Sequence, residues 1–269
     1  DNNTAVGNEA MEANTTGGSN TAVGGDSMGS NTTGANNTGI GQGALFANTT
    51  GANNTALGKS ALVANTTAAS NTAVGFQVLG ANTTGTANTA VGHNTLDATT
   101  TAHNNSAFGY NALTANTTGT LNVAIGSESM ADTTTGANNT AVGHNSLHAN
   151  TTGGTNTAVG QNALLSNTTA SFNVGIGHSA LEGNTTGHSN TAVGKNTLVA
   201  NTTGANNTAV GKAAGATMTT ASNNTAIGTE ALQQTTTGAN NTAVGYAALK
   251  VNTTGHSNAV VGYNSLGAN

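Results

Sequence analysis

The amino-acid sequence repeats every 17 residues without an insertion or a deletion. A glycine closes its most regular phrase, Asn-Thr-Ala-Val-Gly, and recurs at this interval sixteen times from Gly7 to Gly262. With this glycine at position five, the idealised unit reads N-T-A-V-G-x-x-A-L-x-A-N-T-T-G-x-x. A period this short and strict predicts a solenoid, in which each repeat forms one turn and packs on its neighbours.

The length of the period selects the kind of solenoid. Helical repeats need about 33 residues or more, and the recurring Gly, Asn and Thr disfavour one long helix. We therefore predict an all-β fold: a parallel β-solenoid, or β-roll, of sixteen turns that forms a single domain over residues 1–269. Each turn would hold two or three short strands. With rungs about 4.8 Å apart, the turns would build a rod of about 75 Å. The chain starts and stops inside a repeat, which indicates a segment of a longer array.

Each position of the repeat stacks on itself, because a slip of one residue would exchange the faces of a strand. Position four, which starts with Val6, is always apolar, and position nine is Met or Leu except at Gly215. We predict that both columns form the core. Met218 replaces the usual Asn of position twelve and is expected to fill the space beside Gly215. The small residues of position three, such as Ala56, would permit close approach between rods.

Two invariant columns are predicted to be structural ladders. Asn occupies position one in all sixteen repeats, where stacked amides can bond to one another and where Asn tolerates a left-handed corner. The Gly of position five is expected to have a positive φ, whereas position fifteen, which is sometimes Ala, does not require one. The first members of the two ladders are Asn3, Asn20, Asn37, Asn54 and Asn71, and Gly7, Gly24, Gly41, Gly58 and Gly75.

Charged residues follow the same columns. Apart from Asp1, they occur only at positions six, seven, ten and eleven, so the side from position twelve through seventeen to five is charge-free. This side carries a Thr pair at positions thirteen and fourteen in every copy, and we expect it to be the interaction face. An alternative outward rank is Asn-x-Thr from positions twelve and fourteen, and which Thr faces outward is left open. The candidate residues are Thr15, Thr16, Thr32, Thr33, Thr49, Thr50, Thr66, Thr67, Thr83, Thr84, Thr117, Thr118, Thr151, Thr152, Thr202 and Thr203.

Composition excludes several classes of function. Four Lys without any Arg give no cluster for nucleic-acid phosphates, and no apolar run approaches the roughly 18 residues of a membrane span.

We predict no cofactor, no metal and no catalytic residue. His93 and His144 share a column but lie three turns apart, too far for one ion. The carboxylates of Glu9 and Asp26, on adjacent turns, are interpreted as solvated surface charges. Asn-Thr-Thr is also an N-glycosylation sequon, and its use is left open.

The phrase N-T-A-V-G…A-L…N-T-T-G resembles the repeats of bacterial and phage tail-fibre-like surface proteins. Positions one to five, as in Asn122-Val123-Ala124-Ile125-Gly126, are also similar to the N-S-x-A-I-G opening of YadA-like trimeric adhesin head repeats. The adhesin unit is shorter and has no counterpart to N-T-T. The resemblance implies a parallel β-roll, with left-handed coiling as one alternative, commonly trimeric, on a cell surface or virion. It implies no catalytic residues.

Two functional hypotheses follow. The first is a structural and adhesive extracellular fibre shaft that self-associates as a trimer or an end-to-end filament and contacts a surface or a glycan. The alternative is an ice-binding solenoid, because a charge-free array of Thr and Asn at rung spacing could order water. An enzyme is not expected.

Overall fold

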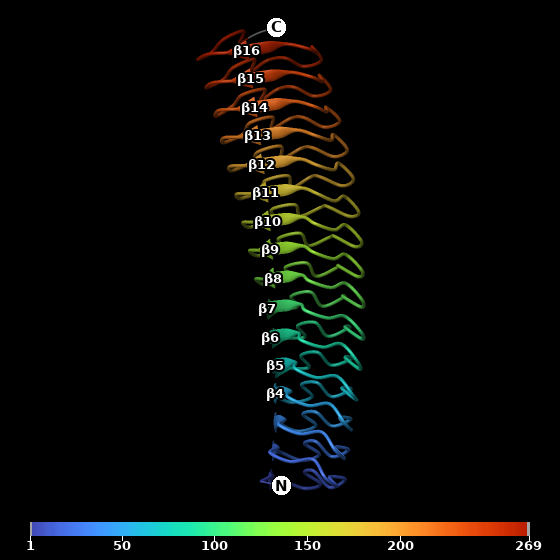
Figure 1. Cartoon of the computed structure of the whole chain (residues 1–269). Coiled ribbons are helices and arrows are strands. Elements are labelled where there is room, and N and C mark those ends of the chain that lie inside the picture. Colours follow the sequence, from blue (N-terminus) through green and yellow to red (C-terminus); the bar gives the residue numbers. More distant parts are fainter. Residues whose placement is uncertain (1, 268–269) are drawn as a thin grey trace. The chain divides into compact units, whose positions relative to one another are not determined.

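The computed structural model describes residues 2–267, which fall into two compact units, one ending at Thr135 and one beginning at Gly136. Each unit is a stack of eight parallel strands, and within residues 2–267 there is no helix (Figure 1). Each strand pairs with the equivalent strand of the next repeat, so that Thr21 lies opposite Thr38. The predicted all-β parallel solenoid is confirmed, with sixteen strands and about fifteen turns of about 17 residues.

Every strand occupies the opening phrase of its repeat. The strands of the first unit are β1 (Thr4–Val6), β2 (Thr21–Val23), β3 (Thr38–Ile40), β4 (Thr55–Leu57), β5 (Thr72–Phe76), β6 (Thr89–His93), β7 (Ser106–Tyr110) and β8 (Val123–Ile125). Those of the second unit are β9 (Thr140–Val142), β10 (Thr157–Val159), β11 (Val174–Ile176), β12 (Thr191–Val193), β13 (Thr208–Val210), β14 (Thr225–Ile227), β15 (Thr242–Val244) and β16 (Ala259–Val261).

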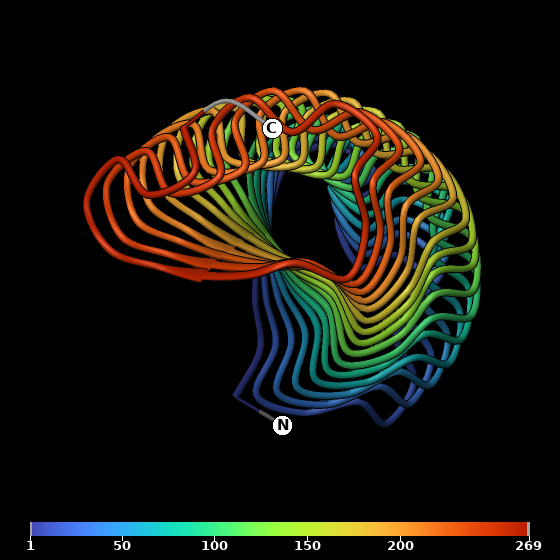
Figure 2. The same ribbon diagram turned by 90° about the horizontal axis from the view of Figure 1, so that it is seen from above.

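The prediction of two or three strands per turn is wrong, because each turn contributes one. Positions seven, nine and seventeen have positive φ, for example 57° at Ser60, 53° at Leu62 and 59° at Asn53, and a left-handed residue interrupts a strand. The remaining backbone still bonds to neighbouring turns. The Leu62 N–H donates to the Val78 carbonyl over 3.0 Å, and the Ser60 N–H donates to the Gln42 carbonyl over 2.9 Å. Seen from above, the turns within each unit have the same outline, and each is slightly rotated relative to the one before (Figure 2).

The corners of the turn also differ in part from expectation. The left-handed Asn residues stand at positions seven and seventeen, as at Asn94 and Asn53, and not at position one. The glycines of position five have φ between 128° and 145°. A Cβ at Gly58 would collide with the carbonyl of Gly75 on the next turn, so this corner needs glycine for both its conformation and its close approach.

The core is built from positions three, eight and nine, and the assignment of position four to the core is wrong. Ala73 and Leu79 are fully buried, whereas Leu57 is 45% exposed and Phe108 is 38% exposed. Alternate residues of a strand face opposite sides, and the strand turns position three inward because little room remains beside the position-nine side chains. Even a Cβ at Gly39 would lie 3.1 Å from the Met28 methyl. The Ala residues of position three are therefore interior and cannot mediate contacts between rods.

The one irregular core turn is locally compensated. Gly215 has a φ of 59°, a value that glycine adopts without strain, and a Cβ there would lie 3.1 Å from the Met218 sulfur. Met218 is fully buried, which confirms that it fills the space left by Gly215. Met218 also affects the preceding turn. The buried Oδ1 of Asn201 has no hydrogen-bond partner, because Met218 carries no amide to donate to it.

The buried Asn of position one ties consecutive turns together. The backbone N–H of Asn71 donates to Asn54 Oδ1 over 3.0 Å, and Asn54 Nδ2 donates to the Ala68 carbonyl over 2.9 Å. Contacts from one side-chain amide to the next, such as the 3.2 Å bond from Asn54 Nδ2 to Asn37 Oδ1, are longer and are not formed in every turn. Asn54 is fully buried, so the ladder works mainly by satisfying backbone groups of the interior.

A second Asn ladder, at position twelve, was missed by the sequence analysis. Asn48 Nδ2 donates to Asn31 Oδ1 over 2.7 Å and to the Gly51 carbonyl over 3.0 Å. Both side chains are buried. The frequent recurrence of Asn at this position was the signal that could have revealed it.

Two leucines of the fourth turn test the core assignment with identical chemistry. We expect Leu62→Ala to lower the free energy of unfolding by about 2–5 kcal/mol, because it opens a cavity in the core. Leu57→Ala should cost about 1 kcal/mol or less, since its side chain is half in solvent and mainly strand propensity is lost. Chemical denaturation followed by circular dichroism measures both, and equal costs would contradict the assignment.

The compensation at Gly215 predicts strong coupling. Gly215→Leu should clash with Met218, and Met218→Asn should leave a void beside Gly215. Each is expected to cost about 1–3 kcal/mol of unfolding free energy. The double variant Gly215→Leu/Met218→Asn restores the consensus turn and a donor for Asn201, so it should be at least as stable as the parent. Additive losses in a double-mutant cycle would show that the two sites are independent.

Adjacent asparagines provide a matched test of the ladder. Asn54→Ala should cost about 1–3 kcal/mol of unfolding free energy, because the buried Asn71 N–H loses its acceptor. The Ala68 carbonyl loses one of its two donors and keeps Asn65 Nδ2. The control Asn53→Ala lies at exposed position seventeen, where Ala87 occurs naturally, and should cost about 1 kcal/mol or less. Similar denaturation midpoints for the two variants would contradict the role of the ladder.

Candidate interaction faces

Charged side chains gather on one side of the turn and are largely solvated. Lys250 Nζ lies 2.6 Å from Glu230 Oε2, and this hydrogen bond raises the pKa of the Lys250 ammonium group. Burial raises the pKa of the Asp97 carboxyl, opposed by a hydrogen bond from the Gly80 backbone. Positions twelve through seventeen and one through five carry no Asp, Glu or Lys within residues 2–267, so any face built from them is neutral.

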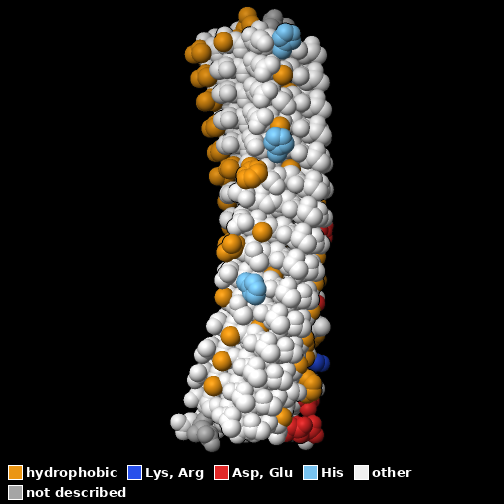
Figure 3. Space-filling view, turned by 45° about the vertical axis from the view of Figure 1, so that its right-hand side comes forward, with side chains coloured by type: hydrophobic (Ala, Val, Ile, Leu, Met, Phe, Trp, Pro, Cys, Tyr) orange, Lys and Arg blue, Asp and Glu red, His pale blue; other side chains and the backbone are white. Residues whose placement is uncertain are grey.

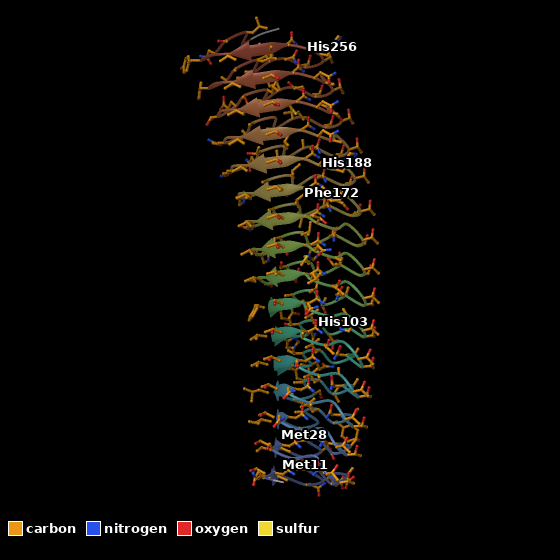
Figure 4. The ribbon with its side chains drawn as sticks, viewed as in Figure 1. Met11, Met28, His103, Phe172, His188 and His256 are labelled. Carbon is orange, nitrogen blue, oxygen red and sulfur yellow. The ribbon has the colours of Figure 1, made fainter. Side chains whose placement is uncertain are left out.

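The described part of the chain offers surfaces and not an enclosed site. Residues 2–267 form no pocket, and they contain no group of three or more His, Asp or Glu side chains that could hold a metal ion. Position sixteen places His188 and His256 on the same side of the second unit (Figure 4). The exposed Phe172 of position seventeen lies on this side near His188, several turns from His256. These positions vary from turn to turn, so this side is chemically uneven.

The two Thr residues of each pair play different roles. Thr49 Oγ1 donates to the Thr66 carbonyl over 3.1 Å, and its side chain is half-buried. Thr50 is exposed, and its hydroxyl has no partner within the described residues. The outward Thr is therefore the second of the pair. The alternative rank Asn-x-Thr is wrong, because the Asn of position twelve is buried beneath it.

The candidate Thr residues divide accordingly. The exposed second members are Thr16, Thr33, Thr50, Thr67, Thr84, Thr118, Thr152 and Thr203. The first members, whose hydroxyls donate to the carbonyl of the next turn, are Thr15, Thr32, Thr49, Thr66, Thr83, Thr117, Thr151 and Thr202. Half of the predicted hydroxyls are thus already used inside the protein.

A second surface was missed by the sequence analysis. Positions two and four of every strand flank the buried position three and point outward, and we call this surface the strand face. It presents Thr72 beside Val74, for example, both half-exposed. Figure 3 shows exposed hydrophobic side chains in a row along one edge of the second unit. The alternation of Thr, Ala and Val in the opening phrase could have revealed this surface, but the Val of position four was assigned to the core.

The strand face has an aromatic border in part of the first unit. The rings of Phe76, His93 and Tyr110, all at position six, stack with centroids 5.2 Å and 5.4 Å apart. The three strands that carry them, β5 to β7, extend to five residues where the others have three. Because the rings stack face to face along the column, mainly their edges are exposed to solvent. They therefore extend the ladder and do not form a flat aromatic surface on which a ligand could stack.

Residues 2–267 contain no helix of the length and hydrophobicity needed to cross a membrane. Comparisons of the chain with family models, curated proteins and solved structures find no match. Function is therefore argued from the faces described above.

Proposed function

We propose that the chain is the structural and adhesive shaft of an extracellular fibre, without an enzymatic activity of its own. The observation that carries this proposal is the uniformity of the turns in both units. Each turn is bonded to its neighbours through the backbone and through buried Asn side chains, and no turn holds a pocket. Such a structure resists bending and repeats each surface group many times, so weak contacts with a surface or glycan add up through multivalency.

The resemblance to tail-fibre-like and YadA-like repeats supports a place on a cell surface or virion and self-association as a trimer or an end-to-end filament. The contact between copies must use exposed columns, because Ala56 and its equivalents at position three are fully buried. Exposed aromatic side chains outside positions two and four, such as Tyr246 and Phe172, are available for such a contact.

The shaft proposal predicts a length that scales with the number of repeats. Duplicating the four turns of residues 37–104 should lengthen the particle by about 19 Å, at about 4.8 Å per rung, and should not lower the melting temperature. Small-angle X-ray scattering measures the length, and light scattering measures the mass. An unchanged length would overturn the shaft, and a monomeric mass at all concentrations would overturn the self-association.

Ice binding is the second candidate function, and one specific observation favours it. Two columns of Thr hydroxyls, at positions two and fourteen, are without protein partners in the described turns and lie on the charge-free side. Such hydroxyls can hydrogen-bond to ordered water while the adjacent methyl groups pack against it. Ice-crystal faceting and thermal hysteresis at micromolar protein test this candidate, and round crystals with no hysteresis would exclude it.

A further inference from the structure

We propose that the strand face, and not the Thr pairs, is the surface that binds ice. This inference rests on ice binding as the second candidate function, and it names the ligand as the ordered water layer at an ice surface. It is supported by the register of the strands, by the free hydroxyls of position two, by the absence of charge and by the rigidity of the face.

The strand face is a regular two-dimensional array. In the first unit the pairing places Thr21, Thr38, Thr55 and Thr72 directly above one another. Rungs lie about 4.8 Å apart, and positions two and four of one strand lie roughly 6.6 Å apart. A sheet in register therefore offers the same groups to ordered water at every rung.

The hydroxyls of the strand face are free to bond outside the protein. In β2 to β6 the Thr side chains at position two make no hydrogen bond within the described residues. The hydroxyls of position thirteen are unavailable, since each donates to a backbone carbonyl, as Thr66 does to Thr83. Position fourteen retains free hydroxyls, but only as a single rank that lies in the bend of the turn. The exposed side chains of position seventeen differ in size from Ser19 to Phe172 and so form no regular second rank.

The chemistry of the strand face suits ordered water better than a second copy of the chain. A column of methyl groups, as at Val74 and Val91, runs beside a column of hydroxyls, as at Thr72 and Thr89, and no charge lies in either column. A dry contact with another copy would bury the hydroxyls, and each one left unpaired would lose its hydrogen bonds to water. Ordered water can instead bond to every hydroxyl and enclose every methyl group.

The side chains of the strand face are held in place. Thr and Val each have a branched Cβ, which restricts χ1. Behind them, Ala73 fills the space against the core with no exposed area, and the buried Asn54 holds the backbone N–H of Asn71 at the start of β5. A surface that is already ordered loses little entropy when it binds, which is a requirement for matching a crystal.

The longest uninterrupted Thr rank at position two lies in the first unit. It runs through six strands, β1 to β6, before Ser106 and Val123 replace Thr. In the second unit, Val174 interrupts the rank at β11. The first unit is therefore the place to test the inference.

The experiment compares two triple variants of the full chain that carry the same added charge on the same turns. The strand-face variant is Thr21→Lys/Thr55→Lys/Thr89→Lys. The matched variant at position fourteen is Thr33→Lys/Thr67→Lys/Thr101→Lys. Substituted turns alternate, so the added charges are about 10 Å apart, where salt screens their repulsion. Circular dichroism checks folding, and ice faceting, thermal hysteresis and light scattering are measured for each variant and for the parent.

The inference predicts that the parent facets ice, that the strand-face variant loses faceting and most of its hysteresis, and that the position-fourteen variant keeps both. Loss of activity only in the position-fourteen variant would overturn the choice of face while leaving ice binding intact. Absence of faceting in the parent would overturn ice binding itself. A strand-face variant whose mass falls relative to the parent would identify this surface as a contact between copies and would also overturn the inference.

A second strand-face variant guards against misfolding. Thr21→Val/Thr55→Val/Thr89→Val keeps the shape and strand propensity of the face and removes only three hydroxyls. Its hysteresis should be lower than that of the parent, while the equivalent Val variant at Thr33, Thr67 and Thr101 should match the parent. Equal activity of the two Val variants would show that the hydroxyls of position two are not used.

Discussion

Hydrogen bonds from buried asparagine side chains to the backbone are the interactions on which this structure depends. A solenoid turn of 17 residues must bend sharply several times, and each bend leaves backbone N–H and carbonyl groups that a regular ladder would have paired. Asn54 accepts from the backbone N–H of Asn71 and donates to the Ala68 carbonyl. At the second ladder, Asn48 donates to the Gly51 carbonyl. Because a buried polar group without a partner costs about 1–3 kcal/mol, these columns permit an interior that contains little beyond Ala and Leu.

The ladders also explain where the chain tolerates change. When Thr99 replaces Asn in the second ladder, its hydroxyl donates to the Asn116 carbonyl instead, and the Oδ1 of Asn82 on the turn before is left without a partner. Met218 has the same effect on Asn201, but it gains the space above Gly215. Each exception therefore disturbs one neighbouring turn and spreads no further, which is expected where a repeat contacts only its neighbours.

The same architecture separates structural surfaces from available ones. Strands only three residues long turn one side chain inward and two outward, so an Ala column supports an outer face of Thr and Val. The Thr pair looks more prominent in the sequence, yet its first hydroxyl is bonded to the next turn, as in Thr49, and only Thr50 and its equivalents face solvent. Adhesion by a fibre and attachment to ice would both draw on these repeated, neutral and rigid columns.

The sequence by itself determined the solenoid, its 17-residue turn, the burial of position nine and the pairing of Met218 with Gly215, because a strict period forces equivalent residues to stack. Tertiary structure alone decided which side of the strand faces inward. Val at position four is the more hydrophobic choice, but the interior beside Leu79 has room only for the methyl group of Ala73. The tertiary structure also decided the left-handed corners at positions seven, nine and seventeen. Hydrogen bonds between turns hold residues such as Leu62 at a positive φ that their local conformational preference disfavours.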